Sequence, residues 1–184
     1  MRIAKILLAG AAAATMVGFL AAPAAAAPTD DTTATFEVLA GTLDITAPAT
    51  ADLGDGAPGG TITGQLGVVT VDDSRGAADA SWEATVTATV FQTGGGTAPE
   101  TVLPSEIDYW SGPETATTGD GTFTEGQAAA GDAEPLDTVT PVIAFTHTGG
   151  TGGNTAAWNP TLVVNVPLDS IAGVYTGTVT HSVA

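Results

Sequence analysis

The chain has 184 residues and a formal net charge of −17, because 20 aspartates and glutamates outnumber three lysines and arginines. This balance excludes nucleic acid as a partner, since binding to phosphates requires clustered basic residues, and it disfavours an anionic membrane surface for the same reason. Only 12% of the residues are charged and 43% are hydrophobic, which is typical of a folded chain and not of a disordered one. Cysteine is absent, so the fold depends on its core alone.

The first 26 residues have the three-part layout of a secretory signal peptide. Arg2 and Lys5 precede a long uncharged apolar run, and small residues end the segment. We expect cleavage after Ala26, which leaves residues 27–184 as a single secreted domain without a membrane span. Of the basic residues only Arg75 then remains against the 20 acidic ones, so the net charge becomes −19.

Strands are the elements that the sequence predicts after residue 30, because apolar residues repeat with a period of two and no segment has a helical period. In chain order, strands are expected at 33–46 (two short ones through Gly41), 64–71, 81–91, 107–110, 121–124, 139–147, 158–168 and 173–184. Glycine-rich connectors occupy 52–60, 93–100, 115–135 and 148–154. The pattern predicts an all-β fold, a single β-sandwich of about seven to ten mostly antiparallel strands with long glycine-rich loops.

Alternation within these strands predicts which side chains face the core. The clearest strand, 81–91, has an apolar face of Trp82, Ala84, Val86, Ala88 and Val90. The faces expected in the next two strands are Val139, Ile143, Phe145 and His147, and then Trp158, Leu162, Val164, Val166 and Leu168. In the last strand Tyr175, Val179, His181 and Val183 face inward, and the strand continues almost to the final residue.

Residue types that support catalysis are few. The chain has no cysteine and no GxSxG motif, and its two histidines, His147 and His181, both lie at strand ends. A Ser–His–Asp set around either histidine has no local signature. A pair of carboxylates could serve a glycosidase, but the acidic residues lie mostly in glycine-rich loops, where carboxylates are usually just solvated. We therefore expect a protein that is not an enzyme.

Calcium is the one cofactor that the sequence leaves open, because clustered carboxylate oxygens are its preferred ligands. The candidate pairs are Asp52 with Asp55, Asp72 with Asp73, and Asp120 with Glu125. None of them matches an EF-hand loop or a calcium-binding repeat. Carboxylates that only keep the turns soluble are the alternative interpretation, and no other metal site is expected.

Two adjacent aromatic residues, Tyr109 and Trp110, lie in the long segment between the predicted strands. Neighbouring side chains on a strand point to opposite faces, so one of the two is a candidate platform for a flat ligand such as a sugar ring. A small satellite core beneath the loop is the alternative. Trp82 and Trp158 are in phase with apolar faces, which favours packing in the core.

Two segments carry a more specific pattern. In the first, 69–91, a strand ends in an Asp-x-Arg-Gly turn (Asp73, Arg75 and Gly76), and Trp82 opens the next strand. The second is IAGVYTGTVTHSV at 171–183. Both resemble the signatures of WxL-domain proteins, which are surface proteins of Gram-positive bacteria. His181 and Val183 stand where that family has the Trp and Leu of its second Trp-x-Leu motif, and the first motif lacks its Leu.

The resemblance spans roughly residues 33–184 and implies non-covalent attachment to the cell wall through peptidoglycan, and assembly with other surface proteins. Together with the aromatic pattern, it gives as candidate ligand-binding residues Trp82, Tyr109, Trp110, Tyr175 and His181. Asp73, Arg75 and Gly76 are expected to form a structural turn, closed by an ion pair of the arginine with a neighbouring aspartate. The alternative function is a self-assembling subunit of a surface layer or fibre, in which edge strands pair between copies.

Overall fold

The structure, a computed structural model, describes residues 27–184 in two parts that are considered separately, because the chain divides after Glu37. Residues 27–37 contain no helix or strand and are exposed to solvent. All strands belong to the second part, the body Val38–Ala184. The expected signal peptide lies outside the described residues. No helical turn between residues 27 and 184 has the length and hydropathy that membrane crossing requires.

Fourteen strands form the described body. They are β1 (Leu43–Thr46), β2 (Thr61–Gln65), β3 (Val69–Ala77), β4 (Trp82–Ala88), β5 (Phe91–Gln92), β6 (Thr101–Val102), β7 (Ile107–Trp110), β8 (Glu114–Thr118), β9 (Thr122–Glu125), β10 (Glu134–Pro135), β11 (Val142–Thr148), β12 (Gly152–Trp158), β13 (Thr161–Asn165) and β14 (Val179–Val183). Three short 3-10 turns complete the described elements: η1 (Ala98–Glu100), η2 (Pro104–Glu106) and η3 (Ala130–Asp132). The predicted all-β class is confirmed, with more and shorter strands than expected.

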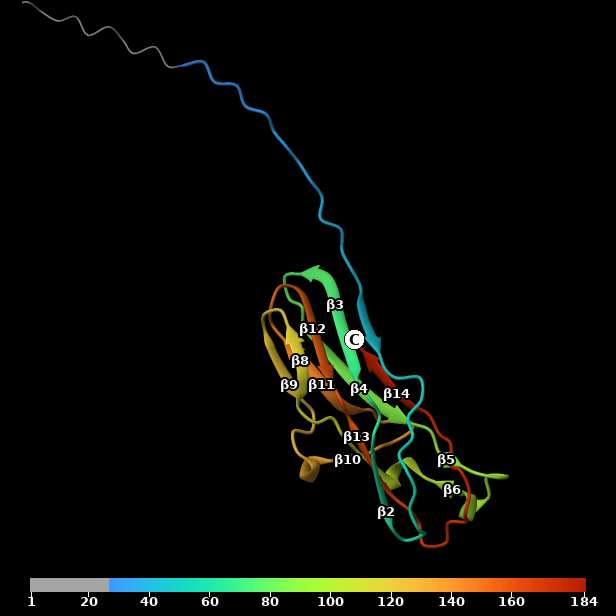
Figure 1. Ribbon diagram of the computed structural model, residues 1–184. Helices are drawn as coiled ribbons and strands as arrows, with labels where there is room; N and C mark the ends of the chain where they lie inside the picture. Colours follow the sequence, from blue (N-terminus) through green and yellow to red (C-terminus); the bar gives the residue numbers. More distant parts are fainter. Residues whose placement is uncertain (1–26) are drawn as a thin grey trace, which may run out of the picture. The chain divides into compact units, whose positions relative to one another are not determined.

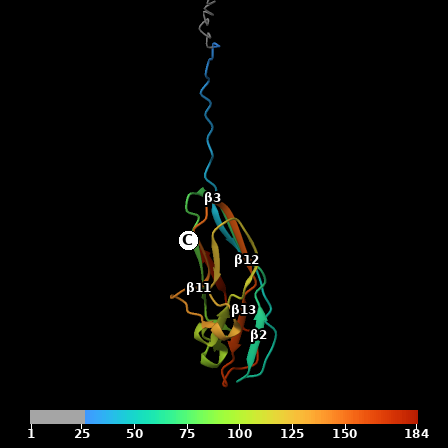
Figure 2. The same ribbon diagram turned by 90° about the vertical axis from the view of Figure 1, so that its left-hand side faces the viewer.

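The strands pair antiparallel in three four-stranded sheets and one two-stranded ribbon, β5-β6. The β3 sheet has the order β1-β3-β12-β8, the β13 sheet has the order β10-β7-β13-β2, and the β4 sheet has the order β14-β4-β11-β9. The chain runs directly from β2 into β3, from β7 into β8 and from β12 into β13, so the first two sheets are successive parts of one bent layer (Figure 1). The β4 sheet forms the opposite layer, and Figure 2 shows its strand β11 on the left and β12 and β13 on the right.

The core lies between these layers, where the apolar faces of both meet. The predicted face of 81–91 is confirmed for its four residues within β4, from Trp82 to Ala88, whose side chains are at most 4% exposed. Val90 lies beyond the end of β4 and is half-buried. Phe145 of β11 stacks on Trp158 of β12 across the sandwich, with ring centroids 5.0 Å apart. Large aromatic side chains contribute much of the apolar area that a sandwich buries, so this stack anchors the two layers to each other.

Two of the predicted strands are interrupted. Between β2 and β3 the chain turns at Gly67, whose φ of +92° is a conformation that favours glycine. Asn159 and Pro160 separate β12 from β13, because proline has no N–H to donate to the ladder. The apolar face expected for the strand predicted at 158–168 is therefore shorter than predicted. Leu168 lies beyond the end of β13 and is 84% exposed.

A β-bulge changes the face that β11 presents to the core. The register between β11 and β4 shifts between Ile143 and Phe145, so Ala144 is the extra residue. Phe145 and His147 are fully buried as predicted, but Ile143 is 44% exposed and Val139 precedes the strand in an exposed turn. The simple alternation failed here because the bulge moves the inward positions by one residue.

The segment 33–40, predicted as a strand, has no ladder partner, and the first strand begins only at Leu43. Gly41 passes so close to β3 that a Cβ at this position would overlap the carbonyl oxygen of Ser74. The backbone N–H of Ser74 donates to the carbonyl of Thr42 at 2.8 Å, which fixes the point where the chain enters the body. Gly41 thus serves a close approach between two backbones and does not form a turn.

The last strand, β14, is part of a sheet as predicted, and its partner is β4. Its inward and outward residues alternate in exposure. The pairing extends to the final residue, because the backbone groups of Ala184 and Glu83 exchange two hydrogen bonds. In an antiparallel pair only every second residue points its N–H and C=O at the partner strand. The backbone groups of Val179, His181 and Val183 therefore point away from β4, at the edge of the sheet.

Candidate functional site

The Asp-x-Arg-Gly turn at the end of β3 is built around an ion pair. Asp73 is 1% exposed, and the guanidinium of Arg75 donates to it from Nε at 2.9 Å and from Nη2 at 2.8 Å. The same Nη2 also donates to the carbonyl oxygen of Ser81, which ties the turn to the start of β4. These hydrogen bonds hold the pKa of Asp73 below its ordinary value and raise that of Arg75. Gly76 follows with a φ of +63°.

Trp82 continues this network into the core. Its indole Nε1 donates to Oδ1 of Asn154 at 2.8 Å, and Nδ2 of Asn154 donates to Oδ2 of Asp73 at 3.3 Å. The side chains thereby connect β3, β4 and β12 at one end of the sandwich. Trp82 is only 4% exposed, so its ring has no free face for a ligand.

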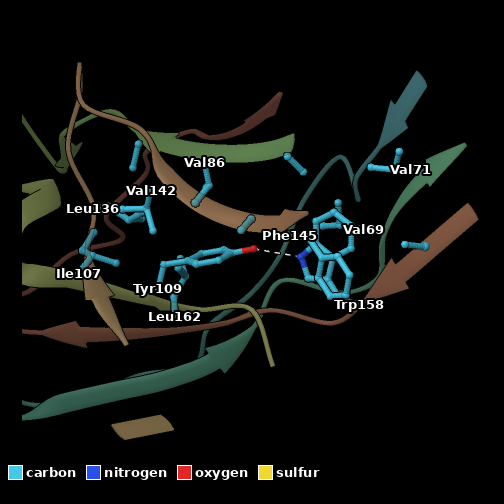
Figure 3. Close-up of a cluster of buried hydrophobic side chains, with 14 of the residues drawn as sticks. Val69, Val71, Val86, Ile107, Tyr109, Leu136, Val142, Phe145, Trp158 and Leu162 are labelled. Atoms are coloured by element: carbon cyan, nitrogen blue, oxygen red, sulfur yellow. Dashed lines mark hydrogen bonds between the residues drawn. The ribbon is translucent and has the colours of Figure 1, made fainter. Parts of the chain in front are cut away.

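A second polar network lies deep between the layers and involves Tyr109, Trp158 and His181. Figure 3 shows one of its contacts, the hydrogen bond between Tyr109 and Trp158. Nε1 of Trp158 donates to the Tyr109 hydroxyl at 3.1 Å, and that hydroxyl lies 3.1 Å from Nε2 of His181. Because the tyrosine oxygen accepts from the tryptophan, its own proton is free to point at the histidine, whose Nε2 then acts as an acceptor. Burial lowers the pKa of His181 to about 4 and raises that of Tyr109.

His147 occupies a third buried position, and its contacts could not be predicted from the sequence. Its Nδ1 lies 2.8 Å from the carbonyl oxygen of Ala80, and its Nε2 lies 2.9 Å from that of Asp120. The ring therefore joins the β3–β4 loop to the β8–β9 loop. Neither His147 nor His181 hydrogen-bonds a serine or a carboxylate in the described structure. The histidines thus belong to structural networks.

Tyr109 and Trp110 do point to opposite faces of β7, as two neighbours on a strand must. Tyr109 is fully buried, whereas Trp110 is half-buried on the outer side of the β13 sheet. The indole Nε1 of Trp110 is shielded from solvent and has no hydrogen-bond partner among the described residues. Of this pair, Trp110 alone keeps part of its ring at the surface.

A large hollow in the body lies beside Tyr175 and has a volume of about 650 Å³. We call it the Tyr175 hollow. Its walls are formed by the loop 51–58, by Phe91 of β5 and by the segment 170–177 that precedes β14. Apolar side chains dominate these walls, namely Leu53, Ile62, Phe91, Val102, Val164, Val166, Ile171, Val174 and Tyr175. A concave apolar surface of this size fits the usual dimensions of a ligand site.

Two hydrogen bonds hold Tyr175 in the wall of the hollow. Its hydroxyl lies 3.0 Å from the carbonyl oxygen of Pro99 and 2.9 Å from that of Ile171, so it joins the segment to η1. Ser170, at the start of the segment, is 8% exposed, and its hydroxyl has no hydrogen-bond partner in the part of the chain that the structure describes. The carboxylates of Asp52 and Asp55 are the charged groups of the lining.

A smaller hollow of about 170 Å³ adjoins the first, and His181 lines it. The two hollows share Ala51, Leu53, Phe91 and Gly177, so they form one continuous depression between the loop 47–58 and the chain leading into β14. Of the five candidate ligand-binding residues, Tyr175 and His181 thus line neighbouring hollows. Trp82 and Tyr109 are buried elsewhere, and Trp110 lies on another face.

The acidic pairs considered for calcium do not converge into a larger cluster. Between residues 27 and 184 no three carboxylate or histidine side chains lie close enough to hold a metal ion. Asp73 is engaged by Arg75, Asp52 accepts from the backbone N–H of Gly54, and Asp120 accepts from that of Thr151. These carboxylates already serve as turn acceptors.

Comparison with known proteins adds no relative. No family model matches the chain, and no curated protein matches it significantly. The site is therefore interpreted from its own geometry.

Replacing Tyr175 by phenylalanine tests whether its hydroxyl orders the hollow. We expect Tyr175→Phe to reduce the free energy of unfolding by about 1 kcal/mol, the usual net value of one hydrogen bond, and to speed amide exchange at Ile171 and Thr176, whose N–H groups donate to the carbonyls of Pro99 and Gln92. Urea unfolding and hydrogen exchange measure the two effects. Thr180→Val, an exposed change in the same part of the chain, is the control and should alter neither by a comparable amount.

Proposed function

We propose that this protein is an exported, non-enzymatic β-sandwich that associates non-covalently with the bacterial cell wall, through peptidoglycan or through a protein that the wall carries, and that the Tyr175 hollow is the contact site. The main support is that residues 171–177, from the second segment that resembles the WxL pattern, form one wall of the hollow. The signal-peptide layout of the first 26 residues supports export.

The chemistry of the hollow indicates what it accepts. Its apolar walls and the ring of Tyr175 suit the apolar face of a sugar or the methyl groups of a peptide. Asp52 and Asp55 add negative charge, and no basic residue lies in the lining. Arg75, the single cation after residue 26, is already paired with Asp73. Ligands with a free amino group or no charge are therefore favoured over anionic ones.

A sedimentation assay on purified peptidoglycan, with and without calcium, tests the proposal. The protein should be retained, and Val174→Glu should lower retention at least tenfold because the added charge sits in the wall of the hollow. Leu168→Glu is the matched control, since both side chains are 84% exposed but Leu168 does not line the hollow. Absence of retention in both conditions would rule out attachment to peptidoglycan.

A further inference from the structure

The segment 33–40, with the sequence TATFEVLA, is the most exposed apolar part of the described chain. Phe36 is 92% exposed, Val38 is 78% exposed and Leu39 is 79% exposed. Apolar side chains gathered at the surface in this way mark an interaction site. The segment belongs to no strand and has no ladder partner among the described residues.

Its sequence has the pattern of a strand that lacks a sheet. In an extended chain Ala34, Phe36, Val38 and Ala40 lie on one face, which is entirely apolar and uncharged. Glu37 and two threonines lie on the other face, together with Leu39. Proline and glycine are absent from the segment, and half of its residues are β-branched or aromatic, as strands prefer.

The chain leaves the body at the end opposite to the Tyr175 hollow. The exit is fixed where Gly41 and Thr42 pass against Ser74 at the end of β3. The hollow lies beside β2, β5 and β6, which Figure 1 shows at the far end of the body from that exit. A segment that leaves one end and an acceptor at the other end give a head-to-tail contact between copies, which continues as an open chain of molecules.

The hollow also offers the backbone groups that an added strand needs. The amides of Ala172, Gly173, Val174 and Tyr175 donate to no other group in the described structure. A strand that binds an exposed chain edge gains affinity from such main-chain hydrogen bonds and specificity from every second side chain, which enters a pocket. Phe36 and Val38 have that spacing, and the hollow of about 650 Å³ is large enough for both.

We propose that residues 33–40 of one copy bind as an extended strand in the Tyr175 hollow of a second copy, with Phe36 and Val38 facing its apolar floor. This inference goes beyond the proposed function, because it gives the same hollow a second occupant, the segment of another copy.

Charge predicts how this contact depends on salt. Each copy after residue 26 carries a single basic residue against 20 acidic ones, so copies repel each other in dilute buffer. Screening acts over about 8 Å at physiological ionic strength, so association of copies should strengthen as salt is added. A cationic partner would show the opposite dependence, because salt weakens attraction between unlike charges.

The test measures the molar mass of residues 27–184 by light scattering over a concentration series in 0.05 M and 0.5 M NaCl (about one decade of ionic strength). The mass should rise with concentration, and more so at high salt. Phe36→Glu and Val174→Glu should each remain monomeric. Leu39→Glu and Leu168→Glu, which place the same charge on equally exposed side chains outside the contact, should associate like the unchanged protein.

Mixing the Phe36→Glu and Val174→Glu variants provides a second readout, because misfolded variants would not form a complex with each other. Phe36→Glu retains an intact hollow and Val174→Glu retains an intact segment, so their mixture should form a one-to-one complex that does not grow further. A monomer at every concentration and salt, or equal loss in the Leu39→Glu control, would overturn the proposal. Retention of Phe36→Glu on peptidoglycan separates the two hypotheses, since wall binding through the hollow does not need the segment.

Discussion

Asp73→Ala is expected to lower the free energy of unfolding by about 2–3 kcal/mol, because hydrogen bonds to a buried charged group contribute about 1.5–3 kcal/mol while the Arg75 side chain is 32% exposed and partly screened by water. The carboxylate is 1% exposed and accepts from Arg75 and Asn154, so its loss leaves the guanidinium and the amide without their acceptor. The effect reaches Trp82 as well, because Asn154 holds the indole N–H. One residue therefore supports the contact of three strands.

Asp72→Ala is the matched control for this substitution. Asp72 is the neighbour of Asp73 on β3, but its side chain points to the solvent on the other face of the strand. We expect it to change stability by no more than about 0.5 kcal/mol, as for other surface substitutions. Urea unfolding followed by tryptophan fluorescence measures both variants. Equal effects of the two would show that the network contributes nothing beyond the loss of a negative charge.

Arg75 makes this ion pair more specific in geometry than a surface salt bridge usually is. Its fork donates to both oxygens of one carboxylate and also to the Ser81 carbonyl, so it fixes the turn between β3 and β4. A bidentate pair of this kind is more specific in geometry than a single lysine contact. The pattern Asp-x-Arg-Gly followed by Trp can therefore be understood as a structural lock at one end of the sandwich.

The sequence predicted best those elements whose pattern is local and uninterrupted. β4 and β14 alternate without a break, and both lie where they were expected. The terminal strand could be predicted because its threonines and apolar residues alternate up to the last residue. The short strands near Ile107 and Thr122 were also found, since each has two or more strand-forming residues between turns.

Prediction failed where pairing depends on distant partners. β12 begins in the glycine-rich stretch 152–154, which favours a loop, but β3 and β8 flank it on both sides and supply its ladder. Residues 33–40 have the opposite problem, because their strand pattern finds no partner in the body. Alternation describes how well a segment fits a sheet, and it does not show whether a neighbouring strand is present.

The candidate site could be predicted only in part. Tyr175 was identified from its position in the terminal pattern, and it does line a hollow of about 650 Å³. The rest of the walls comes from the loop 51–58 and from β5 and β6, which have no sequence signal for proximity to residue 175. The roles of His147 and Tyr109 also depend on contacts between residues that are far apart in the sequence. The shortest of these separations, between Asp120 and His147, is 27 positions.

The largest pH effect is expected at His181. Burial lowers the pKa of its ring to about 4 from the 6.5 that it has when exposed in the unfolded chain. Above pH 6.5 both states are neutral at this residue and it adds no pH dependence. As the pH falls from 6.5 towards 4, the unfolded chain takes up a proton that the folded one does not, so stability is lost across that window and the loss levels off below it.

Because of His181, we therefore expect the free energy of unfolding to fall by about 2–3 kcal/mol between pH 7 and pH 4.5, since a shift of one pKa unit corresponds to about 1.4 kcal/mol. His181→Gln keeps an acceptor for the Tyr109 hydroxyl but does not titrate. Between pH 7 and pH 4.5 the free energy of unfolding of this variant should therefore fall by about 2–3 kcal/mol less than that of the unchanged protein. All other residues are identical in the two proteins, so the difference between the two unfolding curves isolates His181. An NMR titration of the ring with a midpoint near 6.5 would contradict the buried, neutral state that the Tyr109–Trp158 network requires.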